Sequence, residues 1–378
     1  MGYDIIIAGG SFAGLAVAVQ MRGKRVLMVE PHAIGSVQNS ACGTLLAVLE
    51  ATGTVDSLLQ VQNRLVLHLG ESEFEYPLPY SFCTFDFRIF CNRLLLQSNV
   101  EVLRASVLGH RGHEILTTRG IVSAKILIDA TGWRAALATN SRQQTQHHAG
   151  RSFGLETTIP TSEDGLHFYY EPSRLPPFTV GWLFPIGTRA RAGLGSYLGQ
   201  TRMAEALADF THSEFGLSPD GRHGGYFPYR RQQPTTGCVF RIGDAAGQCI
   251  PLTGEGIRPA LHFGAMAGRL VRRVLDGEIR EANALREYRN LVRRHAEPYR
   301  YLLAVQKLLP RLPMAWIERI AGRVKQPDVL DPLLRWYWKS FNPDTLARLW
   351  QPGKLISTKL PSLEHTQNAL GDSERTAL

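Results

Sequence analysis

Residues 4–30, DIIIAGGSFAGLAVAVQMRGKRVLMVE, decide the fold of this chain. They begin with an apolar run, Ile5–Ala8, which predicts a strand that is buried on both faces. A glycine turn and apolar residues at helical spacing follow, and Val26–Val29 predicts a second strand that ends at Glu30. A strand, a glycine turn, a helix and a second strand with a terminal acid form the βαβ fingerprint of dinucleotide-binding domains.

Physical requirements of dinucleotide binding explain the residue types in this turn. Gly9 allows a tight turn, and the free N–H groups near Ala13 and Gly14, at the helix start, can face a pyrophosphate. Gly14 also lets the helix pack closely on the strand, whereas Glu30 can accept hydrogen bonds from ribose hydroxyls. Ser11 replaces the second glycine of G-x-G-x-x-G, and its small side chain is tolerable beside a phosphate. The alternative is an ordinary βαβ turn with chance glycines.

The composition is that of an ordinary soluble protein. The 378 residues, 44% hydrophobic and 20% charged, exceed one ordinary core and predict one large or two interleaved domains. The five cysteines are an odd number without the spacing of a metal site, which fits a reducing compartment. Asp4 precedes the first apolar run and no basic region leads it, so we expect no signal peptide and a cytoplasmic protein.

The net charge of +9 is concentrated in one part of the sequence. Residues 269–325 contain 14 lysines and arginines against 6 acidic residues. Such a segment fits nucleic acid, anionic lipid or a solvated helix face. We expect no nucleic-acid partner, and we interpret the segment as a peripheral contact with the inner face of a membrane.

Strand-like and helical patterns alternate along the rest of the chain. Residues 61–80 and 100–128 predict strands, with a helix at 85–96 between them. Residues 151–230 are aromatic and strand-like, and one helical piece interrupts them at 203–210. From Gly256 the pattern is mostly helical.

Three stretches together resemble flavoproteins of the glutathione-reductase-like FAD fold. They are the βαβ unit, the turn Asp129-Ala-Thr-Gly132 and the segment Arg241-Ile-Gly-Asp244. More narrowly, the sequence resembles the geranylgeranyl reductase family, which is related to the flavin monooxygenases. The motifs that carry this narrower resemblance are Cys42-Gly43, Gly181-Trp182-Leu183-Phe184-Pro185 and Pro251-Leu-Thr-Gly-Glu-Gly-Ile257. The resemblance covers roughly residues 1–275.

The resemblance implies an α/β fold in which an antiparallel β-sheet substrate domain is inserted into a Rossmann-like FAD-binding domain and a helical C-terminal region follows. The FAD-binding domain is expected in two parts, at 1–150 and 236–275. The substrate domain is expected at 151–235, the helical region at 276–352 and a flexible tail at 353–378.

The resemblance also implies which residues hold FAD. They are Gly9, Ser11, Ala13, Gly14, Glu30, Ala41, Cys42, Gly43, Thr44, Arg88, Val107, Gly132, Gly243, Asp244, Gly256 and Ile257. The residues up to Glu30 would hold the ADP half, and Val107 would present its backbone to the adenine. The segment 41–44 would lie along the ribityl chain and the ring, and Asp244 would accept from a ribityl hydroxyl. The helix start at 256–257 would stabilise negative charge on the reduced flavin.

The sequence departs from the family pattern at two positions. An arginine usually stands three residues before a phenylalanine of the helix at 85–96. If that phenylalanine is Phe90, Phe87 occupies the arginine position and Arg88 stands one residue late. In the turn 254–256 the usual middle glycine is Glu255, which would place a carboxylate near the flavin edge or at the domain boundary.

The expected substrate-lining residues are Trp182, Phe184 and Tyr169, with plain sheet core as the alternative for the first two. Cys42 is our candidate proton donor, because it belongs to the ring-side segment and precedes a predicted helix whose start would lower the thiol pKa. A small buried filler is the alternative for Cys42, and Tyr169 and Glu255 are weaker donor candidates.

Two further candidates are assigned structural or no roles. Asp129 is expected to cap the turn at a strand end rather than to act in catalysis. The adjacent His147 and His148 have no partner carboxylate or cysteine at metal-ligand spacing, so we expect no metal site.

Three absences narrow the chemistry. No second G-x-G-x-x-G fingerprint exists, so an external donor, NAD(P)H or a redox protein, must supply electrons. Aromatic hydroxylases of this fold have Asp-Gly where this chain has Thr131-Gly132, and halogenases need a lysine that the stretch between Lys24 and Lys125 does not contain. We therefore predict hydride transfer from reduced FAD to a carbon-carbon double bond of an apolar, isoprenoid or lipid-like substrate. The alternatives are an FAD-dependent monooxygenase acting on a polycyclic or lipid-like compound and an FAD-binding redox sensor.

Overall fold

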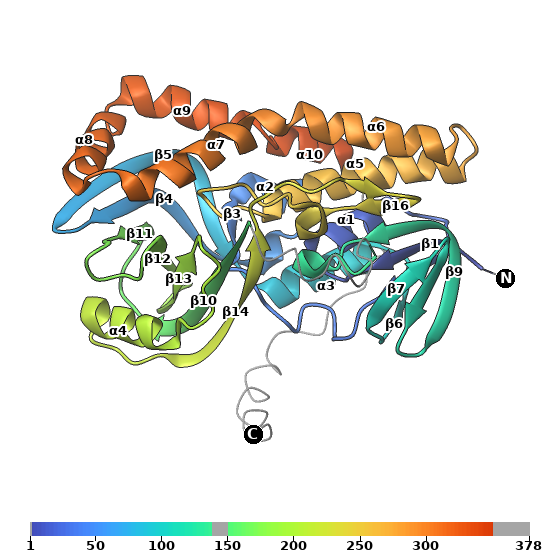
Figure 1. Cartoon of the computed structure of the whole chain (residues 1–378), viewed down its shortest axis with the longest axis horizontal. Helices are drawn as coiled ribbons and strands as arrows, with labels where there is room; N and C mark the ends of the chain where they lie inside the picture. Colours follow the sequence, from blue (N-terminus) through green and yellow to red (C-terminus); the bar gives the residue numbers. More distant parts are fainter. Residues whose placement is uncertain (1, 138–149, 351–378) are drawn as a thin grey trace.

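The structure, a computed structural model, describes residues 2–137 and 150–350 (Figure 1). Two large sheets lie side by side, and a layer of helices from the C-terminal part of the chain runs along both (Figure 1). The predicted histidine pair at 147–148, the tail at 353–378 and most of the polar connection at 139–150 lie outside the described residues.

The first sheet is the predicted nucleotide-binding sheet. Its central strands, in the order β16-β9-β1-β2-β6, are all parallel to their neighbours. They are β1 (Tyr3–Ala8), β2 (Val26–Val29), β6 (Val100–Leu103), β9 (Gly120–Asp129) and β16 (Val239–Arg241), with β15 (Thr235–Thr236) at one edge. Parallel strands bring their carboxyl ends to one edge of the sheet, which is where such folds bind ligands.

The two faces of this sheet are covered differently. Ile5 and Ile7 belong to a buried cluster with α1 (Phe12–Val19), α3 (Phe87–Gln97) and α5 (Ile257–Leu275). Ile6 and Leu27 face the other side and pack against β7 (Val107–Arg111) and β8 (Glu114–Thr117). The run of apolar residues in β1 therefore reflects a strand that is buried on both faces, as predicted.

Glycines of α5 allow it to pack closely on α1. A Cβ atom at Gly264 would lie 2.7 Å from Ala16 Cβ, and one at Gly268 would lie 2.7 Å from Gln20 Cγ. The long C-terminal helix is thus fixed against the first helix of the chain, and its start is held next to the glycine turn.

The second sheet contains strands from two separate parts of the sequence. Its order is β14-β10-β13-β12-β11-β4-β5-β3. The strands from the later part are β10 (Arg151–Pro160), β11 (Leu166–Tyr170), β12 (Thr179–Pro185), β13 (Arg189–Ser196) and β14 (Asp220–Pro228). Those from the earlier part are β3 (Gly43–Leu45), β4 (Leu58–Leu69) and β5 (Ser72–Phe85).

This composition corrects two expectations. Residues 43–85 were expected in the FAD-binding domain, but the alternation at 61–80 belongs to a hairpin that extends the second sheet. The sheet is also mixed rather than antiparallel, because β11 pairs with β4 in parallel, with Leu166 opposite Leu65. A pairing between strands 100 residues apart leaves no local trace in the sequence.

Helix α4 (Ala204–Phe215) covers one face of the second sheet, and the helix was predicted at 203–210. On the other face, Arg191 of β13 donates to the carbonyl oxygens of Ala41 and Phe85 at 2.8 and 3.2 Å. These bonds tie the second sheet to the segment that precedes β3.

The C-terminal helices connect the two sheets from above (Figure 1). They are α6 (Glu281–Arg294), α7 (Ala296–Leu308), α8 (Met314–Val324), α9 (Pro327–Lys339) and α10 (Pro343–Leu349). Tyr76 of β5 donates to the Ala321 carbonyl of α8 at 3.0 Å, while Trp350 donates to Gln97 of α3 at 3.0 Å. The remaining elements are α2 (Leu46–Thr52) and the short 3-10 turns η1 (Val55–Ser57), η2 (Gly132–Arg134), η4 (Gly243–Ala246) and η5 (Leu309–Arg311).

Candidate active site

Steric constraints explain the glycines in the turn after β1, as the sequence predicted. Gly9 has φ = 105°, and a Cβ atom there would lie 2.1 Å from the Ala130 carbonyl oxygen. A Cβ atom at Gly14 would lie 2.0 Å from the Gly9 carbonyl oxygen. No side chain fits at either position, so helix α1 approaches the strand ends as closely as its backbone allows.

The start of α1 offers free donors. Ser11 is the N-cap in an extended conformation, makes no side-chain cap, and accepts the first helical bond from Leu15 N at 2.9 Å. The N–H groups of Phe12, Ala13 and Gly14 therefore have no acceptor inside the helix. Gly243 (φ = 65°) lies against this start, because its Cβ atom would be 3.0 Å from Ala13 Cβ. The arrangement fits a diphosphate.

Glu30 lies at the end of β2, where the ribose was expected. Its two carboxylate oxygens accept from Gly10 N at 2.9 Å and from His32 N at 3.1 Å. The side chain thus ties the glycine turn to the loop after β2, and the same oxygens are the acceptors that a ribose would use.

Asp244 and the start of α5 converge, as the resemblance implied. Within the described residues no donor lies within hydrogen-bonding distance of the Asp244 carboxylate, and burial raises its pKa to about 7. A Cβ atom at Gly256, the N-cap of α5, would lie 3.9 Å from Asp244 Oδ1, and Ile257 follows as the first helical residue. A half-buried acceptor without a partner among the described residues is what a ribityl hydroxyl would satisfy.

Asp129 has the structural role that was expected. It is fully buried and accepts from Thr131 Oγ1 at 2.7 Å, Thr131 N at 3.1 Å and Leu137 N at 3.1 Å. These bonds shape the turn that contains Gly132, which has φ = 69°.

Two further residues that were predicted to contact FAD lie in different settings. Val107 is the first residue of β7, pairs with Thr117 and packs against the buried cluster that includes Leu27 of β2. Arg88 is exposed on α3, whereas Phe87 is buried and packs edge-on against Phe12 with ring centroids 5.4 Å apart. The offset seen in the sequence is therefore real: an aromatic ring occupies the inward position where the family has an arginine.

The segment 41–44 joins the two sheets at the expected ring side. Thr44 is fully buried, and its hydroxyl oxygen has no hydrogen-bond partner among the described residues. The Ala41 carbonyl accepts from Arg191, and a Cβ atom at Gly43 would lie 2.7 Å from the Phe82 ring and 3.3 Å from the Phe184 ring. The orphaned hydroxyl of Thr44 fits a contact with a bound polar group.

Cys42 corrects the expectation for its acidity. It does not precede a helix directly, because β3 intervenes, and it has φ = 51°. The side chain is fully buried, and burial raises the pKa of the thiol to about 12. The thiol therefore stays protonated near neutral pH, rather than being activated as a thiolate.

The face of the second sheet that looks toward Gly43 carries aromatic side chains. Phe184 lies 6.4 Å from Phe82 and 5.4 Å from Phe168, measured between ring centroids. Trp182 shares this face, since it pairs across the strands with Phe168 and its ring lies over Gly193. The structure thus brings Trp182 and Phe184 together beside the segment 41–44.

Tyr169 is the clearest correction among the predicted substrate residues. It pairs with Gly181, the neighbour of Trp182, so its side chain points to the opposite face of the sheet. There it stacks on His68 at 4.2 Å and packs on Phe210 of α4 at 5.2 Å. It lines the core under α4 and not the aromatic face.

Glu255 is also placed differently from the expectation. Its carboxylate forms an ion pair with Arg258, which is 1% exposed, and accepts from the hydroxyl of Tyr337 in α9. Arg258 in turn donates to the Ser340 carbonyl at 3.2 Å. These bonds hold α9 against the start of α5 and engage the Glu255 carboxylate in a structural contact.

Sequence reasoning missed a buried polar group on the aromatic face. Glu156, which is 3% exposed, accepts from Trp182 Nε1 at 2.9 Å and lies 2.9 Å from His223 Nε2. The three residues come from β10, β12 and β14, so only the strand pairing brings them together. In the sequence, the charged Glu156 within the strand-like stretch of β10 was the one signal that could have indicated this group.

The chain is similar in sequence to curated archaeal reductases. It is 22% identical over 373 residues to digeranylgeranylglycerophospholipid reductase 2 of Methanopyrus kandleri, a match that covers 87% of this chain and 92% of that protein. It is 25% identical over 266 residues to digeranylgeranylglycerophospholipid reductase of Methanocaldococcus jannaschii, which covers 66% and 63%. No protein-family model matches the chain.

Solved structures show the same fold. A geranylgeranyl bacteriochlorophyll reductase-like protein from Thermoplasma acidophilum superposes with a TM-score of 0.77 at 18% identity, over 92% of this chain and 98% of that one. The resemblance to the geranylgeranyl reductase family is confirmed. The predicted class, an FAD-dependent oxidoreductase, is confirmed with it. A p-nitrophenol 4-monooxygenase from Pseudomonas putida shares the fold with a TM-score of 0.68 at 15% identity, over 90% and 98% of the two chains.

No helix of residues 2–137 and 150–350 is both long and apolar enough to cross a membrane.

Proposed function

We propose that this geranylgeranyl reductase-like protein saturates carbon-carbon double bonds of an isoprenoid lipid. The observation that carries the proposal is the aromatic face of Trp182, Phe184 and Phe168, which lies beside the segment 41–44. A surface of aromatic side chains suits a prenyl chain, which has only methyl groups, methylene groups and double bonds to contact. The named relatives are reductases of digeranylgeranylglycerophospholipid, and we infer the same substrate class here.

The cofactor would be held along the carboxyl edge of the first sheet. The N–H groups at the start of α1 bind the diphosphate, Glu30 accepts from the ribose, and Asp244 accepts from the ribityl chain. The unpartnered hydroxyl of Thr44 and the N–H groups at the start of α5 face the ring end. FAD, once reduced, supplies the hydride.

Reduction of a double bond needs a proton as well as a hydride, one for each carbon. The thiol of Cys42 is the donor that we propose, because it lies in the ring-side segment and stays protonated at neutral pH. Arg191, bound to the neighbouring Ala41 carbonyl, fixes this segment and favours the thiolate that remains after transfer. Hydride and proton add to adjacent carbons, and the thiol is reprotonated from water.

A monooxygenase is the second candidate, favoured by the shared fold with p-nitrophenol 4-monooxygenase. The two reactions differ in their need for oxygen, since saturation of an alkene proceeds without it and hydroxylation does not. A redox sensor would turn over no substrate in either condition. The aromatic rings that line this face beside Gly43, those of Phe82, Phe168 and Phe184, favour the reductase.

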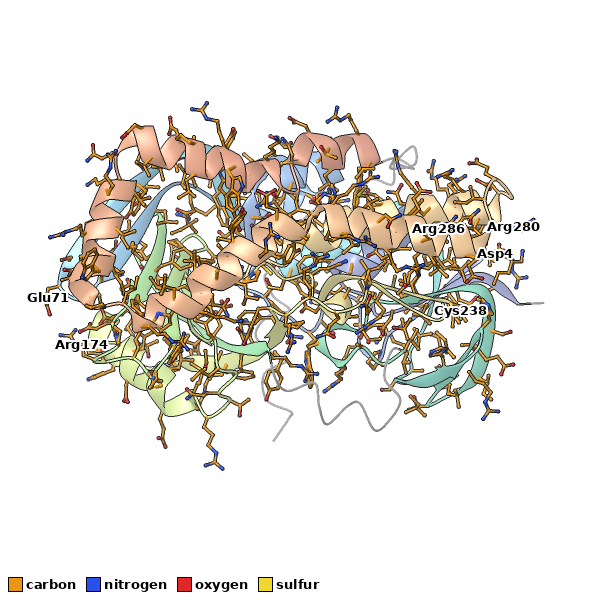
Figure 2. The ribbon with its side chains drawn as sticks, turned by 45° about the horizontal axis from the view of Figure 1, so that its top comes forward. Asp4, Glu71, Arg174, Cys238, Arg280 and Arg286 are labelled. Atoms are coloured by element: carbon orange, nitrogen blue, oxygen red, sulfur yellow. The ribbon has the colours of Figure 1, made fainter. Side chains whose placement is uncertain are left out.

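The proposed lipid substrate requires access to a membrane. Figure 2 shows Arg280 and Arg286 at one end of the molecule, and Figure 1 shows α8 near the opposite end, so the basic segment 269–325 does not form one compact surface. Exposed apolar residues gather instead in its second half. They are Tyr301, Val305 and Leu308 of α7 and Trp316 and Ile320 of α8.

Basic side chains accompany these apolar residues. Arg300, Lys307, Arg311 and Arg319 are all exposed, and Arg319 lies 5.6 Å above the Trp316 ring. Apolar side chains that enter the lipid interface beside arginines that meet anionic head groups are typical of peripheral membrane contacts. We propose that α7 and α8 lie on an anionic bilayer.

Vesicle flotation tests this contact. Wild-type protein should float with phosphatidylglycerol-containing vesicles and not with phosphatidylcholine vesicles, and Trp316→Glu with Ile320→Glu should abolish flotation. Leu96→Glu, which changes an exposed apolar residue on α3, is the matched control and should leave flotation unchanged. Equal flotation of wild type and the α8 variant would refute the proposed surface.

Product analysis tests the reaction. The purified protein should be yellow, and under anaerobic conditions with dithionite it should add two hydrogens per double bond to digeranylgeranylglycerophospholipid, measured by mass spectrometry. A product that gains one oxygen atom and forms only in air would favour the monooxygenase instead.

A further inference from the structure

A polar pocket that Asp244 helps to line lies outside the aromatic face and the glycine turn. It is enclosed by η2, the start of β10, the end of β14 and η4. Trp133, Arg134, Arg151, Gln232, Arg241 and Asp244 contribute its polar and aromatic lining. Three arginines thus face a pocket that contains one acidic residue.

The arginines have no acidic partners within the described residues. Arg151 is 8% exposed, and its guanidinium lies over the Trp133 ring, 4.9 Å from the ring centre. Arg134 lies 5.1 Å from the centre of the same ring and makes no ion pair. The sequence between Arg134 and Arg151 contains no aspartate or glutamate, so it supplies no partner either.

Arg241 is buried and only partly satisfied. It is 6% exposed, donates from Nη1 to the Gln233 carbonyl at 3.1 Å, and has a buried Nε without a partner among the described residues. The nearby carboxylate of Asp129 is occupied by Thr131 and Leu137. Burial lowers the pKa of both Arg151 and Arg241, because it removes their charges from water, and the nearby Asp129 carboxylate offsets only part of that cost for Arg241.

Arg151 and Arg241 are buried guanidinium groups that form no ion pair within the described residues, and an anionic ligand would complete them. We propose that this pocket binds a diphosphate group. Guanidinium forks match phosphate oxygens in pairs, and a diphosphate carries enough charge to neutralise three arginines, which a single carboxylate does not. Trp133 holds Arg134 and Arg151 against its ring and so keeps their donors oriented.

Two ligands carry this group, FAD itself and the nicotinamide nucleotide that would serve as external electron donor. The pocket includes Asp244 but no residue of the turn 9–14, where the start of α1 already offers N–H groups for the FAD diphosphate. Because those N–H groups already suit the diphosphate of FAD, we assign the pocket to the donor. That assignment rests on the proposed function only in requiring that NAD(P)H reduces the flavin.

Calorimetric titration with inorganic pyrophosphate tests the proposal. The FAD-loaded wild type should bind it, and Arg151→Ala and Arg134→Ala should each weaken binding at least tenfold. Arg134 is exposed, so its replacement leaves the core intact even if the Arg151 variant folds poorly. Arg222→Ala is the matched control, because Arg222 is exposed near the far end of β14 and does not line the pocket.

The same titration, combined with flavin reduction, distinguishes whether FAD or the nicotinamide nucleotide places its diphosphate in the pocket. Binding to the FAD-loaded protein, together with an at least tenfold higher NAD(P)H concentration for half-maximal anaerobic flavin reduction in Arg134→Ala, identifies the donor site. Binding only after FAD is removed, with competition by FAD, identifies the cofactor's own diphosphate. Dithionite carries no diphosphate, so its reduction of the flavin should be the same in all variants.

No saturable pyrophosphate binding to either form of the wild type, or equal binding by wild type and both arginine variants, would overturn the proposal. Neither titration uses a prenyl lipid. Failure of the proposed reductase reaction would therefore leave this result intact, and failure here would leave that reaction untouched.

Discussion

The glycine turn after β1 and the aromatic face of the second sheet differ in how the sequence encodes them. The turn, Gly9 to Glu30, is one continuous stretch in which steric demands fall on neighbouring residues. The aromatic face combines side chains of the consecutive strands β11 and β12 with Phe82 of the distant strand β5, and its composition depends on which side of each strand faces the segment 41–44. Local chemistry therefore predicts the cofactor end well, whereas the substrate end requires the strand register.

The largest effect is expected at Gly9. Gly9→Ala combines a positive φ with a Cβ atom 2.1 Å from the Ala130 carbonyl, so the turn must open and FAD should be lost. We expect destabilisation of more than ~3 kcal/mol in thermal or urea unfolding, with colourless protein.

Gly23→Ala is the matched control. Gly23 also has a positive φ, 73°, but no atom lies within 4 Å of an added Cβ. It should cost only about 1 kcal/mol and keep FAD, which separates backbone strain from the close approach. Equal losses in the two variants would contradict the steric account of the turn.

The second-largest effect is expected at Cys42, at the boundary between the two regions. Cys42→Ala should retain FAD but lose ~10²–10⁴-fold in turnover, because a positioned proton donor is removed, and Cys42→Ser should keep part of the rate. With a thiol pKa of about 12, the wild-type rate should show no cysteine titration between pH 6 and 9.

Cys91→Ala is the control for Cys42, since Cys91 is another fully buried thiol of the same core. It should change stability rather than turnover. If Cys42→Ala and Cys91→Ala had equal rates, the Cys42 thiol would be packing alone, and the proton would come from water or another side chain.

A smaller effect should distinguish the two faces of the second sheet. Phe184→Leu changes the aromatic face beside Gly43 and should raise KM for the prenyl lipid several-fold with little loss of stability. Tyr169→Leu changes the core under α4 and should lower the unfolding free energy by ~1–3 kcal/mol without changing KM. Steady-state kinetics and urea unfolding of both variants measure this, and a KM effect in Tyr169→Leu alone would reverse our assignment of the faces.

The smallest effect is a pH dependence at Asp244. Burial raises its pKa from 3.8 to about 7, so the stability it contributes to the FAD-free protein is present below pH 3.8 and is lost as pH rises toward 7. FAD affinity should change in the opposite direction, because the ionised carboxylate is the better acceptor. Asp244→Asn should flatten the pH dependence of both the stability and the FAD affinity. Thermal unfolding measures the first and fluorescence titration the second. An unchanged pH dependence in Asp244→Asn would show that another group titrates.

Much of the fold was predictable from the sequence. The βαβ unit, the strands at 100–128 and the helical C-terminal part follow from local periodicity and glycine placement, and the structure contains them. The membership of the hairpin at 58–85 in the second sheet was not predicted, because a parallel pairing between β4 and β11 decides it. No pattern within either strand indicates that pairing.

The site shows the same division. Ala13, Gly14 and Gly243 were predicted from motifs and do converge at the start of α1. Tyr169 was assigned to the wrong face, and Glu156 was missed, because alternation along a strand does not say which face meets a ligand. The acidity of Cys42 was misjudged because a strand, rather than a helix, follows it and the thiol is fully buried.

The central claim is that reduced flavin in this protein passes its hydride to a prenyl double bond without oxygen. An anaerobic single-turnover experiment tests it most directly, with dithionite-reduced protein freed of excess reductant, mixed with digeranylgeranylglycerophospholipid and followed by flavin absorbance. The account predicts that the flavin is reoxidised by the lipid, with one double bond saturated per flavin. A flavin that stays reduced until oxygen is admitted would contradict it.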